Sequence, residues 1–186
     1  SPRRQAQLRH ARPDLRLELL RGNVDTRLRR LAEGELDAIL LACAGLERLG
    51  LGSRITQVLD LELSLPAVGQ GVIGIECRED DATSRAALVA LHHEPSFVRL
   101  KAERAFAQTL GGSCHSPIAA HAAIDRESLV VHGFVGSPDG HEVYREVERG
   151  RPADTEALGR RLAARMQAAG AGALLDRLRD EAAAAS

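Results

Sequence analysis

Three short strand-like runs in the second half of the chain constrain its fold more than any other feature. They cover residues 118–124, 129–135 and 142–147, and each has the length and apolar content typical of a strand. Two polar turn sequences separate them, Asp125-Arg126-Glu127 and Ser137-Pro138-Asp139-Gly140. We therefore expect a small antiparallel sheet of three strands.

Helical sequence surrounds these strands. Residues 95–110 carry apolar side chains at helical spacing, with Pro95 in the first turn, where proline is well tolerated. From Thr155 onward the chain is again amphipathic, and Gly170 and Gly172 are expected to break that helix. The second half of the chain is therefore predicted to form a compact α+β unit.

The first half has a different order of elements. After an arginine-rich helix that ends near Pro13, residues 15–20 and 37–42 are predicted strands, and residues 24–33 and 46–49 are predicted helices. Strands that alternate with helices favour a parallel, doubly wound sheet.

One corner of this first half is a candidate anion site. Asn23 is expected to cap the helix over residues 24–33. The free N–H groups and the positive end of the helix dipole then point toward the turn that contains Arg21.

Residues 65–71 separate the two halves. Gly69 and Gly71 precede a new predicted strand at 72–77 and a predicted helix at 82–92, so we expect a hinge or domain crossing here. These glycines do not form a dinucleotide-binding loop, because that motif follows a strand and opens a helix.

The charge distribution indicates an anionic partner. The net charge is -1, yet the first thirty residues hold nine arginines against Asp14, Glu18 and Asp25. Aromatic content is 2% and tryptophan is absent, so a base-stacking platform for nucleic acid is disfavoured and small carboxylates or phosphates are expected.

Other classes of protein are also disfavoured. No apolar run approaches the roughly 18 residues of a membrane span, and no secretory signal is visible. Cys43, Cys77 and Cys114 lie far apart, without metal-ligand spacing, which fits a reducing cytoplasm and predicts no metal site. Cys43 is expected to be a packed core thiol at the end of a strand.

The third cysteine has an unusual setting, Gly111-Gly112-Ser113-Cys114-His115-Ser116-Pro117. Glycine and proline there favour an irregular, partly open loop, so Cys114 is a candidate for covalent attachment. The alternative is a small apolar residue that fills a gap beneath the loop, because free cysteine is often buried. His115 is a candidate base, although a neighbouring loop side chain commonly points away.

Several longer motifs run in a consistent order along the chain. They are Arg3-Arg4-Gln5, Leu20-Arg21-Gly22-Asn23-Val24 with Thr26-Arg27, Ala44-Gly45-Leu46-Glu47-Arg48-Leu49-Gly50, Leu65-Pro66-Ala67-Val68-Gly69-Gln70-Gly71 and Gly74-Ile75-Glu76-Cys77-Arg78. In these motifs the chain resembles the porphobilinogen deaminase family, also called hydroxymethylbilane synthase. The resemblance covers nearly the whole chain.

The resemblance implies a transferase of tetrapyrrole and heme biosynthesis. Members of the family deaminate four porphobilinogen molecules and join them into linear hydroxymethylbilane on a covalently bound dipyrromethane cofactor. The family links this cofactor by a thioether to a cysteine in a glycine-rich loop, a place that Cys114 occupies here. The expected partners are porphobilinogen and the growing oligopyrrole, with no nucleic acid and no membrane, and the full-length protein is expected to be a monomer.

The arginines acquire roles by the same resemblance. Ser1, Arg3 and Arg4 are expected to contact the cofactor, and Arg21 and Arg27 to hold carboxylates of cofactor or substrate. Arg48 is expected to bind substrate. The resemblance gives no binding role to the remaining early arginines, which are expected to be solvated: Arg9, Arg12, Arg16, Arg29 and Arg30.

The resemblance also implies a domain order. Residues 1–66 would be part of a second α/β domain, residues 67–92 a hinge with a returning strand and helix of the first domain, and residues 93–186 a C-terminal α+β domain with the cofactor cysteine. The α/β part would be doubly wound and two-lobed, as in periplasmic binding proteins.

Two departures from the family pattern limit these expectations. The family loop usually reads Gly-Gly-Cys-Gln-Val-Pro-Ile-Gly, whereas this chain has Ser113, His115, Ser116 and Ala119. No aspartate here matches the family's catalytic motif, which lies upstream, so we expect no catalytic residue in this chain and no synthase activity from it alone. A non-catalytic anion-binding α/β module is the alternative; it explains the arginines but not Cys114.

Overall fold

The computed structural model describes residues 1–112 and 116–184. The chain divides into two compact units, one of Ser1–Asp14 with Leu61–Ser186 and the other of Leu15–Asp60. The division of the chain into residues 1–66, 67–92 and 93–186 stays a prediction.

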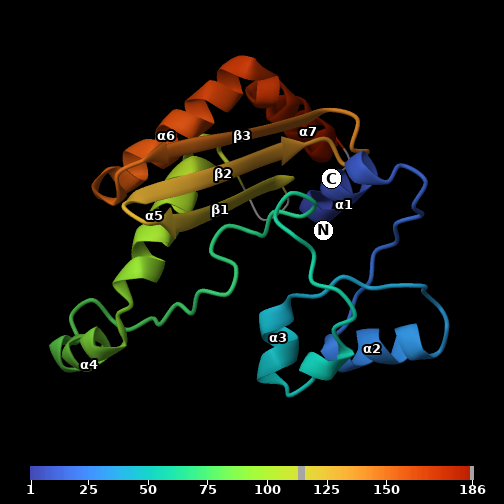
Figure 1. The fold of residues 1–186 in the computed structure, drawn as a ribbon, viewed down its shortest axis with the longest axis horizontal. Coiled ribbons are helices and arrows are strands. Elements are labelled where there is room, and N and C mark those ends of the chain that lie inside the picture. Colours follow the sequence, from blue (N-terminus) through green and yellow to red (C-terminus); the bar gives the residue numbers. More distant parts are fainter. Residues whose placement is uncertain (113–115, 185–186) are drawn as a thin grey trace. The chain divides into compact units, whose positions relative to one another are not determined.

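The larger unit is built on an antiparallel sheet with the strand order β1-β2-β3 (Figure 1). The strands are β1 (Ile118–Asp125), β2 (Ser128–Gly136) and β3 (Val143–Gly150). The pairing places Ala122 opposite Val131 and Phe134 opposite Arg145. The predicted three-stranded antiparallel sheet is therefore confirmed.

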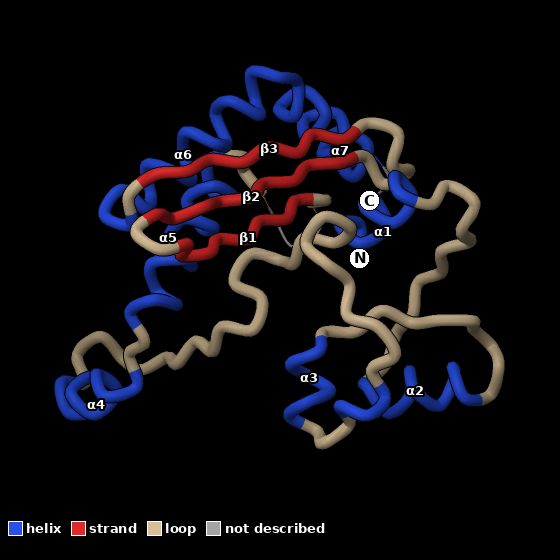
Figure 2. The backbone as a smooth tube through the Cα atoms, in the orientation of Figure 1, coloured by secondary structure: helices blue, strands red, loops and turns tan. Residues whose placement is uncertain are grey.

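Helices accompany this sheet in the described part of the larger unit (Figure 2). They are α1 (Pro2–Ala11), α4 (Ala82–Leu88), α5 (Glu94–Thr109), α6 (Thr155–Met166) and α7 (Gly172–Ala184). A short 3-10 turn (Val89–Leu91) extends α4, and Asp81 caps α4 by accepting a hydrogen bond from the Ser84 N–H. These helices agree with the predicted ones to within a few residues.

The two faces of the sheet have different covers, because successive strand residues point to opposite sides. On one face, Val131 and Val135 of β2 pack in a fully buried cluster with Phe106 of α5 and Leu158 of α6. On the other face, Ala119 and Phe134 pack with Ala6 of α1 and with Leu65. Helix α1 and the segment around Leu65 therefore belong to the same packed body as the sheet.

The crossing of α5 and α6 depends on a glycine. A Cβ atom on Gly159 of α6 would lie 2.2 Å from the carbonyl oxygen of Ala102 on α5. The two helix backbones can approach this closely only because position 159 has no side chain.

The predicted helix break near Gly170 is confirmed. The backbone is kinked over Gln167–Ala171, where Gly170 has φ of 119°, and α7 starts at Gly172. A Cβ atom on Gly170 would also lie 2.4 Å from the Tyr144 hydroxyl of β3. Left-handed backbone and close approach both favour glycine at this position.

The smaller unit contains two helices among its described residues, α2 (Val24–Ala32) and α3 (Cys43–Arg48), and a 3-10 turn (Gly52–Arg54). Its buried apolar side chains are Leu28 and Leu46. Cys43 is half-buried in the first turn of α3. The prediction that Cys43 ends a strand is therefore wrong.

The strands predicted at residues 15–20, 37–42 and 72–77 are absent from the structure. These segments are irregular, so the strand prediction is wrong there and a doubly wound sheet is not confirmed. The physical reason is that a strand needs a hydrogen-bonded neighbour. Within the described part of the chain, no backbone ladder connects these segments to another strand. The fold is a mixed α/β arrangement with one antiparallel sheet.

Candidate cofactor-binding site

Helix α1 presents two of the predicted cofactor ligands. Ser1 is its N-cap residue, and Arg3 and Arg4 follow in the first turn. Arg3 is only 9% exposed, and its Nη1 donates a hydrogen bond of 2.8 Å to the carbonyl oxygen of Leu65. Burial, and then the positive charge of Arg4, lower the pKa of Arg3 to about 10. The guanidinium at this pKa is still a cation at neutral pH, and burial makes that cation costly.

Gln7 lies one turn after Arg3 and holds the same partner. Its Oε1 accepts a hydrogen bond of 2.7 Å from the Leu65 N–H, and its Nε2 donates one of 3.0 Å to the Leu65 carbonyl. Gln7 is 2% exposed, so these bonds are shielded from water. Sequence reasoning missed Gln7; its spacing of four residues from Arg3, which puts both on one helix face, was the available signal.

Two predicted ligands flank the start of α2 in the smaller unit. Asn23 caps this helix, because its Oδ1 accepts a hydrogen bond of 2.9 Å from the Thr26 N–H. Arg27 donates from Nε to the carbonyl of Gly22 at 2.8 Å, and Arg21 immediately precedes that glycine. The predicted strand-to-helix corner is therefore a real helix N-terminus with Arg21 and Arg27 beside it, although no strand leads into it. Arg48 is the last residue of α3.

The arginines of the chain divide into two groups by their ion pairs. Four that the sequence left without a binding role lie in ion pairs with nearby carboxylates: Arg12, Arg16, Arg29 and Arg30. Among the described residues, Arg3, Arg21, Arg27 and Arg48 have no carboxylate within ion-pair distance. Four of the five arginines expected to bind an anion therefore have no carboxylate partner in this part of the chain, a property that they share with Arg9.

Arg9 differs from the expectation that it is solvated. It is partly buried, and its Nη1 donates to the carbonyl of Pro138 at 3.1 Å. This bond connects α1 to the turn between β2 and β3. Arg9 therefore has a structural contact, which sequence spacing could not predict because the two residues lie far apart in the chain.

Cys114 and His115 lie outside the described residues, so their predicted roles stay predictions. The chain on either side is described. Helix α5 ends at Thr109, Gly111 follows with φ of 66°, and the Pro117 carbonyl accepts a hydrogen bond from the Gly136 N–H as β1 begins. The cysteine position is therefore bracketed by α5 and β1.

A buried carboxylate on α5 was missed by sequence reasoning. Glu103 is 7% exposed and accepts a hydrogen bond of 2.7 Å from the Gly69 N–H and one of 2.8 Å from the Ala122 N–H. Burial raises the pKa of Glu103, while the two N–H donors and the charge of Arg99 oppose that rise. Helical periodicity around Glu103 gave no signal, because an acidic residue in a helix is usually exposed.

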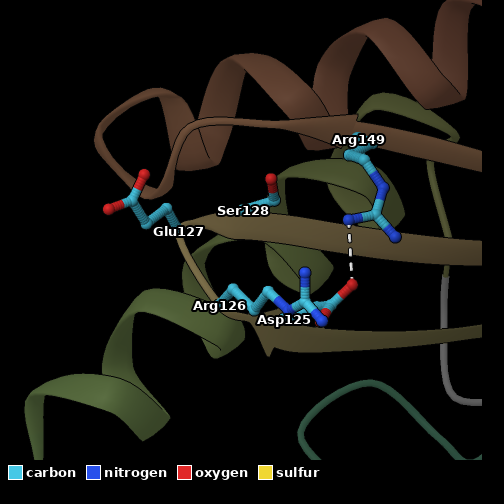
Figure 3. Close-up of a pocket in the computed structure, with 5 residues that line it drawn as sticks. All are labelled: Asp125, Arg126, Glu127, Ser128 and Arg149. Carbon is cyan, nitrogen blue, oxygen red and sulfur yellow. Dashed lines mark hydrogen bonds and ion pairs between the residues drawn. The ribbon is translucent and has the colours of Figure 1, made fainter.

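A surface hollow of about 610 Å³ lies at the turn between β1 and β2 (Figure 3). It is lined by Asp125, Arg126, Glu127, Ser128 and Arg149, and Arg149 pairs with Asp125 at 3.0 Å. The strand register puts this turn at the opposite end of the sheet from Phe134 and α1. The hollow is therefore separate from the arginines of α1.

The described residues contain no cluster of histidine, cysteine and acidic side chains that could hold a metal ion. Across the same part of the chain, no helix has the length and apolar character needed to cross a membrane.

Two models of one protein family match the chain. Residues 1–86 match "Porphobilinogen deaminase, dipyromethane cofactor binding domain", and residues 97–168 match "Porphobilinogen deaminase, C-terminal domain". The chain belongs to the porphobilinogen deaminase family. A porphobilinogen deaminase of Trichlorobacter lovleyi is 47% identical over 174 residues, which is 94% of this chain and 56% of that relative. The chain thus spans about half the length of the curated relative it matches.

The family match groups the candidate residues. All the arginines with predicted binding roles fall within the part that matches the porphobilinogen deaminase cofactor-binding domain. Cys114 and Glu103 fall within the part that matches the C-terminal domain of the porphobilinogen deaminases. The description of the domain that residues 1–86 match names a dipyrromethane cofactor, which agrees with the cofactor expected from the sequence.

Proposed function

We propose that this chain is part of a hydroxymethylbilane synthase, which joins four porphobilinogen molecules into linear hydroxymethylbilane on a dipyrromethane cofactor. The observation that carries the proposal is the separation of the arginines. Four of the five arginines assigned to carboxylate binding have no acidic partner among the described residues, namely Arg3, Arg21, Arg27 and Arg48, whereas four of the five others in the first thirty residues do. The match to the family's cofactor-binding domain supports the same ligand.

The residues fit a ligand with several carboxylates. Each pyrrole of the cofactor carries an acetate and a propionate, and a planar guanidinium can bind a carboxylate through two parallel hydrogen bonds. Arg3 suits this role because its charge is already buried and lacks a described carboxylate partner. Each charged hydrogen bond contributes about 1.5 to 3 kcal/mol, so a few arginines suffice without an aromatic clamp.

Each part of the chain has a separate task in this proposal. Ser1, Arg3 and Arg4 orient cofactor carboxylates, while Arg21 and Arg27 hold cofactor or substrate carboxylates and Arg48 holds substrate. The Cys114 thiolate forms the thioether by attacking the electrophilic methylene carbon of a pyrrole unit whose carbon–nitrogen bond has broken with loss of ammonia. When bound, the cofactor supplies the pyrrole to which substrate units are joined.

Intact-mass spectrometry of the purified chain tests the anchor. We expect a covalent adduct of the mass of a dipyrromethane on the wild-type chain and its loss in Cys114→Ser. Cys43→Ser and Cys77→Ser are matched controls that should keep the adduct. An adduct that persists in Cys114→Ser would contradict the assignment of Cys114.

We further propose that these 186 residues alone have no synthase activity. General acid–base catalysis needs a group held against the pyrrole nitrogens, and no aspartate of this chain matches the family's motif. Incubation of the chain with porphobilinogen should give no hydroxymethylbilane above the rate of a buffer control. Steady formation of hydroxymethylbilane that scales with protein concentration would overturn this proposal.

The finer features expected from the resemblance belong to the same proposal. We propose that the α/β part of the full-length protein is doubly wound and two-lobed, as in periplasmic binding proteins. We also propose a cytoplasmic, monomeric full-length protein that binds neither nucleic acid nor membrane.

A further inference from the structure

Residues 65–71 contact two helices of the larger unit, α1 and α5. At one end, the backbone of Leu65 is held by Gln7 and Arg3 of α1. At the other end, the Gly69 N–H donates to Glu103 of α5 at 2.7 Å. Helix α1 carries Arg3 and Arg4, and α5 ends five residues before Cys114 in the sequence, so this segment contacts both the helix of the predicted cofactor ligands and the helix that precedes the predicted anchor.

Glu103 makes this connection at the free edge of the sheet. Among the described strands, β1 pairs only with β2, so the N–H groups on its other edge have no strand partner. One carboxylate oxygen of Glu103 accepts from the Ala122 N–H of β1, and the second accepts from the Gly69 N–H. The side chain therefore holds the 65–71 segment against β1 although the two have no direct backbone pairing in the described residues.

The geometry requires a carboxylate in place of an amide. Two N–H groups point at the two oxygens of Glu103, and each oxygen serves one donor. A glutamine has only one oxygen, and its NH2 group would face the second N–H, donor against donor. Loss of a buried, charged hydrogen bond costs about 1.5 to 3 kcal/mol, which corresponds to roughly tenfold or more in an opening equilibrium.

Residues 65–71 have little room to move so as to compensate for a lost hydrogen bond to Glu103. Val68 packs against the main core, and a Cβ atom on Gly69 would lie 3.0 Å from the Leu100 Cδ1 atom of α5. Gly69 and Gly71 both have positive φ, 69° and 84°, and two tight turns shape the segment. This segment is anchored at Leu65 and Gly69 and is shaped by tight turns. A displacement of Gly69 is therefore expected to move Leu65 as well.

We propose that Glu103 is a positioning residue that fixes α1, with Arg3 and Arg4, relative to α5 by clamping the 65–71 segment that contacts both helices. The role of Arg3, Arg4 and Cys114 in this statement rests on the proposed function. The clamp itself does not rest on the proposed function, because all of its contacts join residues of this chain within one compact unit.

Amide exchange and chemical shifts measured by 15N NMR on the 186-residue chain test the clamp. In Glu103→Gln we expect an amide of Gly69 or Ala122 to exchange about tenfold faster or more, and its proton resonance to move as the bond to a carboxylate is lost. The Leu65 amide and the side-chain amide of Gln7 should shift as well. Glu94→Gln, an exposed change on the same helix, should leave all four signals unchanged.

A second variant tests the end of the segment at Leu65. Gln7→Ala removes the bonds to Leu65, and we expect faster exchange at Gly69 if the segment transmits the change. Unchanged Gly69 and Ala122 signals in Glu103→Gln would overturn the clamp. Changes confined to those two amides, with Leu65 and Gln7 unaffected and Gly69 unaffected in Gln7→Ala, would overturn the link to α1.

The adduct measurement then separates this inference from the proposed function. Glu103→Gln should carry a smaller fraction of the dipyrromethane-sized adduct than Glu94→Gln, because Arg3 and Arg4 are no longer fixed relative to α5. A wild-type chain with no adduct counts against the proposed function, and the amide signals still decide the clamp. Equal adduct fractions in the two variants, with the clamp broken by NMR, would overturn the positioning role.

Discussion

Single charged residues in this protein differ in what neutralises them. Arg12 and Asp14 form an exposed ion pair at 2.6 Å, and such surface pairs contribute little to stability because water and salt screen them. Arg3 and Glu103 are buried instead, and their hydrogen bonds go to backbone groups of the 65–71 segment and of β1. Substitution at these two positions should therefore affect the protein more than substitution of the many surface pairs.

Two histidines on neighbouring strands give a prediction about pH. His121 and His132 are half-buried and face each other across β1 and β2. Burial is the main cause that lowers the pKa of both histidines. The charge of His132 lowers the pKa of His121 further, and the charge of Arg145 lowers the pKa of His132 further. A folded-state pKa below the unfolded value means that the neutral form is preferred in the fold. Stability should then be full above about pH 6.5 and fall as the pH drops through the unfolded value toward the folded one.

Urea unfolding at pH 7.5 and pH 5.5 measures this effect. The double variant His121→Gln/His132→Gln should lose less stability between the two pH values than the wild-type chain. His92→Gln, an exposed histidine, is the control and should keep the wild-type difference. Equal losses in the wild type and the double variant would show that the cross-strand pair does not contribute.

At the scale of elements, the α5–α6 crossing depends on close backbone contact. Gly159→Ala would place a Cβ atom 2.2 Å from the Ala102 carbonyl oxygen, a backbone atom that cannot rotate away. We expect a loss of about 3 kcal/mol of unfolding free energy, at the upper end of the usual cost of overpacking. Thermal and urea unfolding both report it.

Gly172→Ala is the matched control for that change. Gly172 begins α7 with ordinary helical φ of -61°, and its nearest neighbour for an added Cβ is 3.7 Å away. Alanine there should be neutral or raise stability by about 0.5 to 1 kcal/mol. Equal effects of the two substitutions would mean that helix propensity, and not helix contact, decides the result at position 159.

The sequence predicted the elements that are stabilised locally. The three strands of the sheet follow from short apolar runs and polar turns, and the break at Gly170 follows from a residue that tolerates φ of 119°. Residues 15–20, 37–42 and 72–77 have the same local strand pattern yet form no strand, because pairing depends on neighbours that periodicity does not report. Element type was therefore predictable only where partners lie close in the chain.

The candidate site shows the same limit. Arg21, Arg27 and Arg48 could be named from motifs because each lies in a distinctive local sequence. The contacts of Glu103 and Gln7 could not be predicted, because their partners Gly69, Ala122 and Leu65 are distant in sequence and the bonds go to backbone atoms. A hydrogen bond to a backbone group does not depend on the partner's side chain, so no sequence motif marks it.

At the scale of the whole molecule, the two units differ in how much they bury. The unit of Leu15–Asp60 has Leu28 and Leu46 as its buried apolar side chains, whereas the other unit has a large cluster around Phe106. Regions with few buried contacts open at low free energy. The smaller unit is therefore expected to be the less stable part of the isolated chain.

Hydrogen–deuterium exchange on the intact chain measures this difference. Amides of α2 and α3 should exchange about a hundredfold faster or more than those of β2, which lies at the centre of the sheet. The amides of α7, a helix of the larger unit, serve as an internal reference for helical protection. Equal protection of α2, α3 and β2 would show that the chain opens as one cooperative body.

The two hydrogen bonds between Gln7 and Leu65 also set the register of the backbone at this contact. Gln7 requires an N–H donor and a carbonyl acceptor from the same residue, and Leu65 supplies both. The next residue is Pro66, which has no N–H to offer. A slip of the backbone by one position in that direction would leave the Gln7 oxygen without its donor in a buried place. The Gln7–Leu65 pair therefore fixes which residue of the segment faces α1. Deletions or insertions between Gln7 and Leu65 are tolerated only if both hydrogen bonds of this pair are kept.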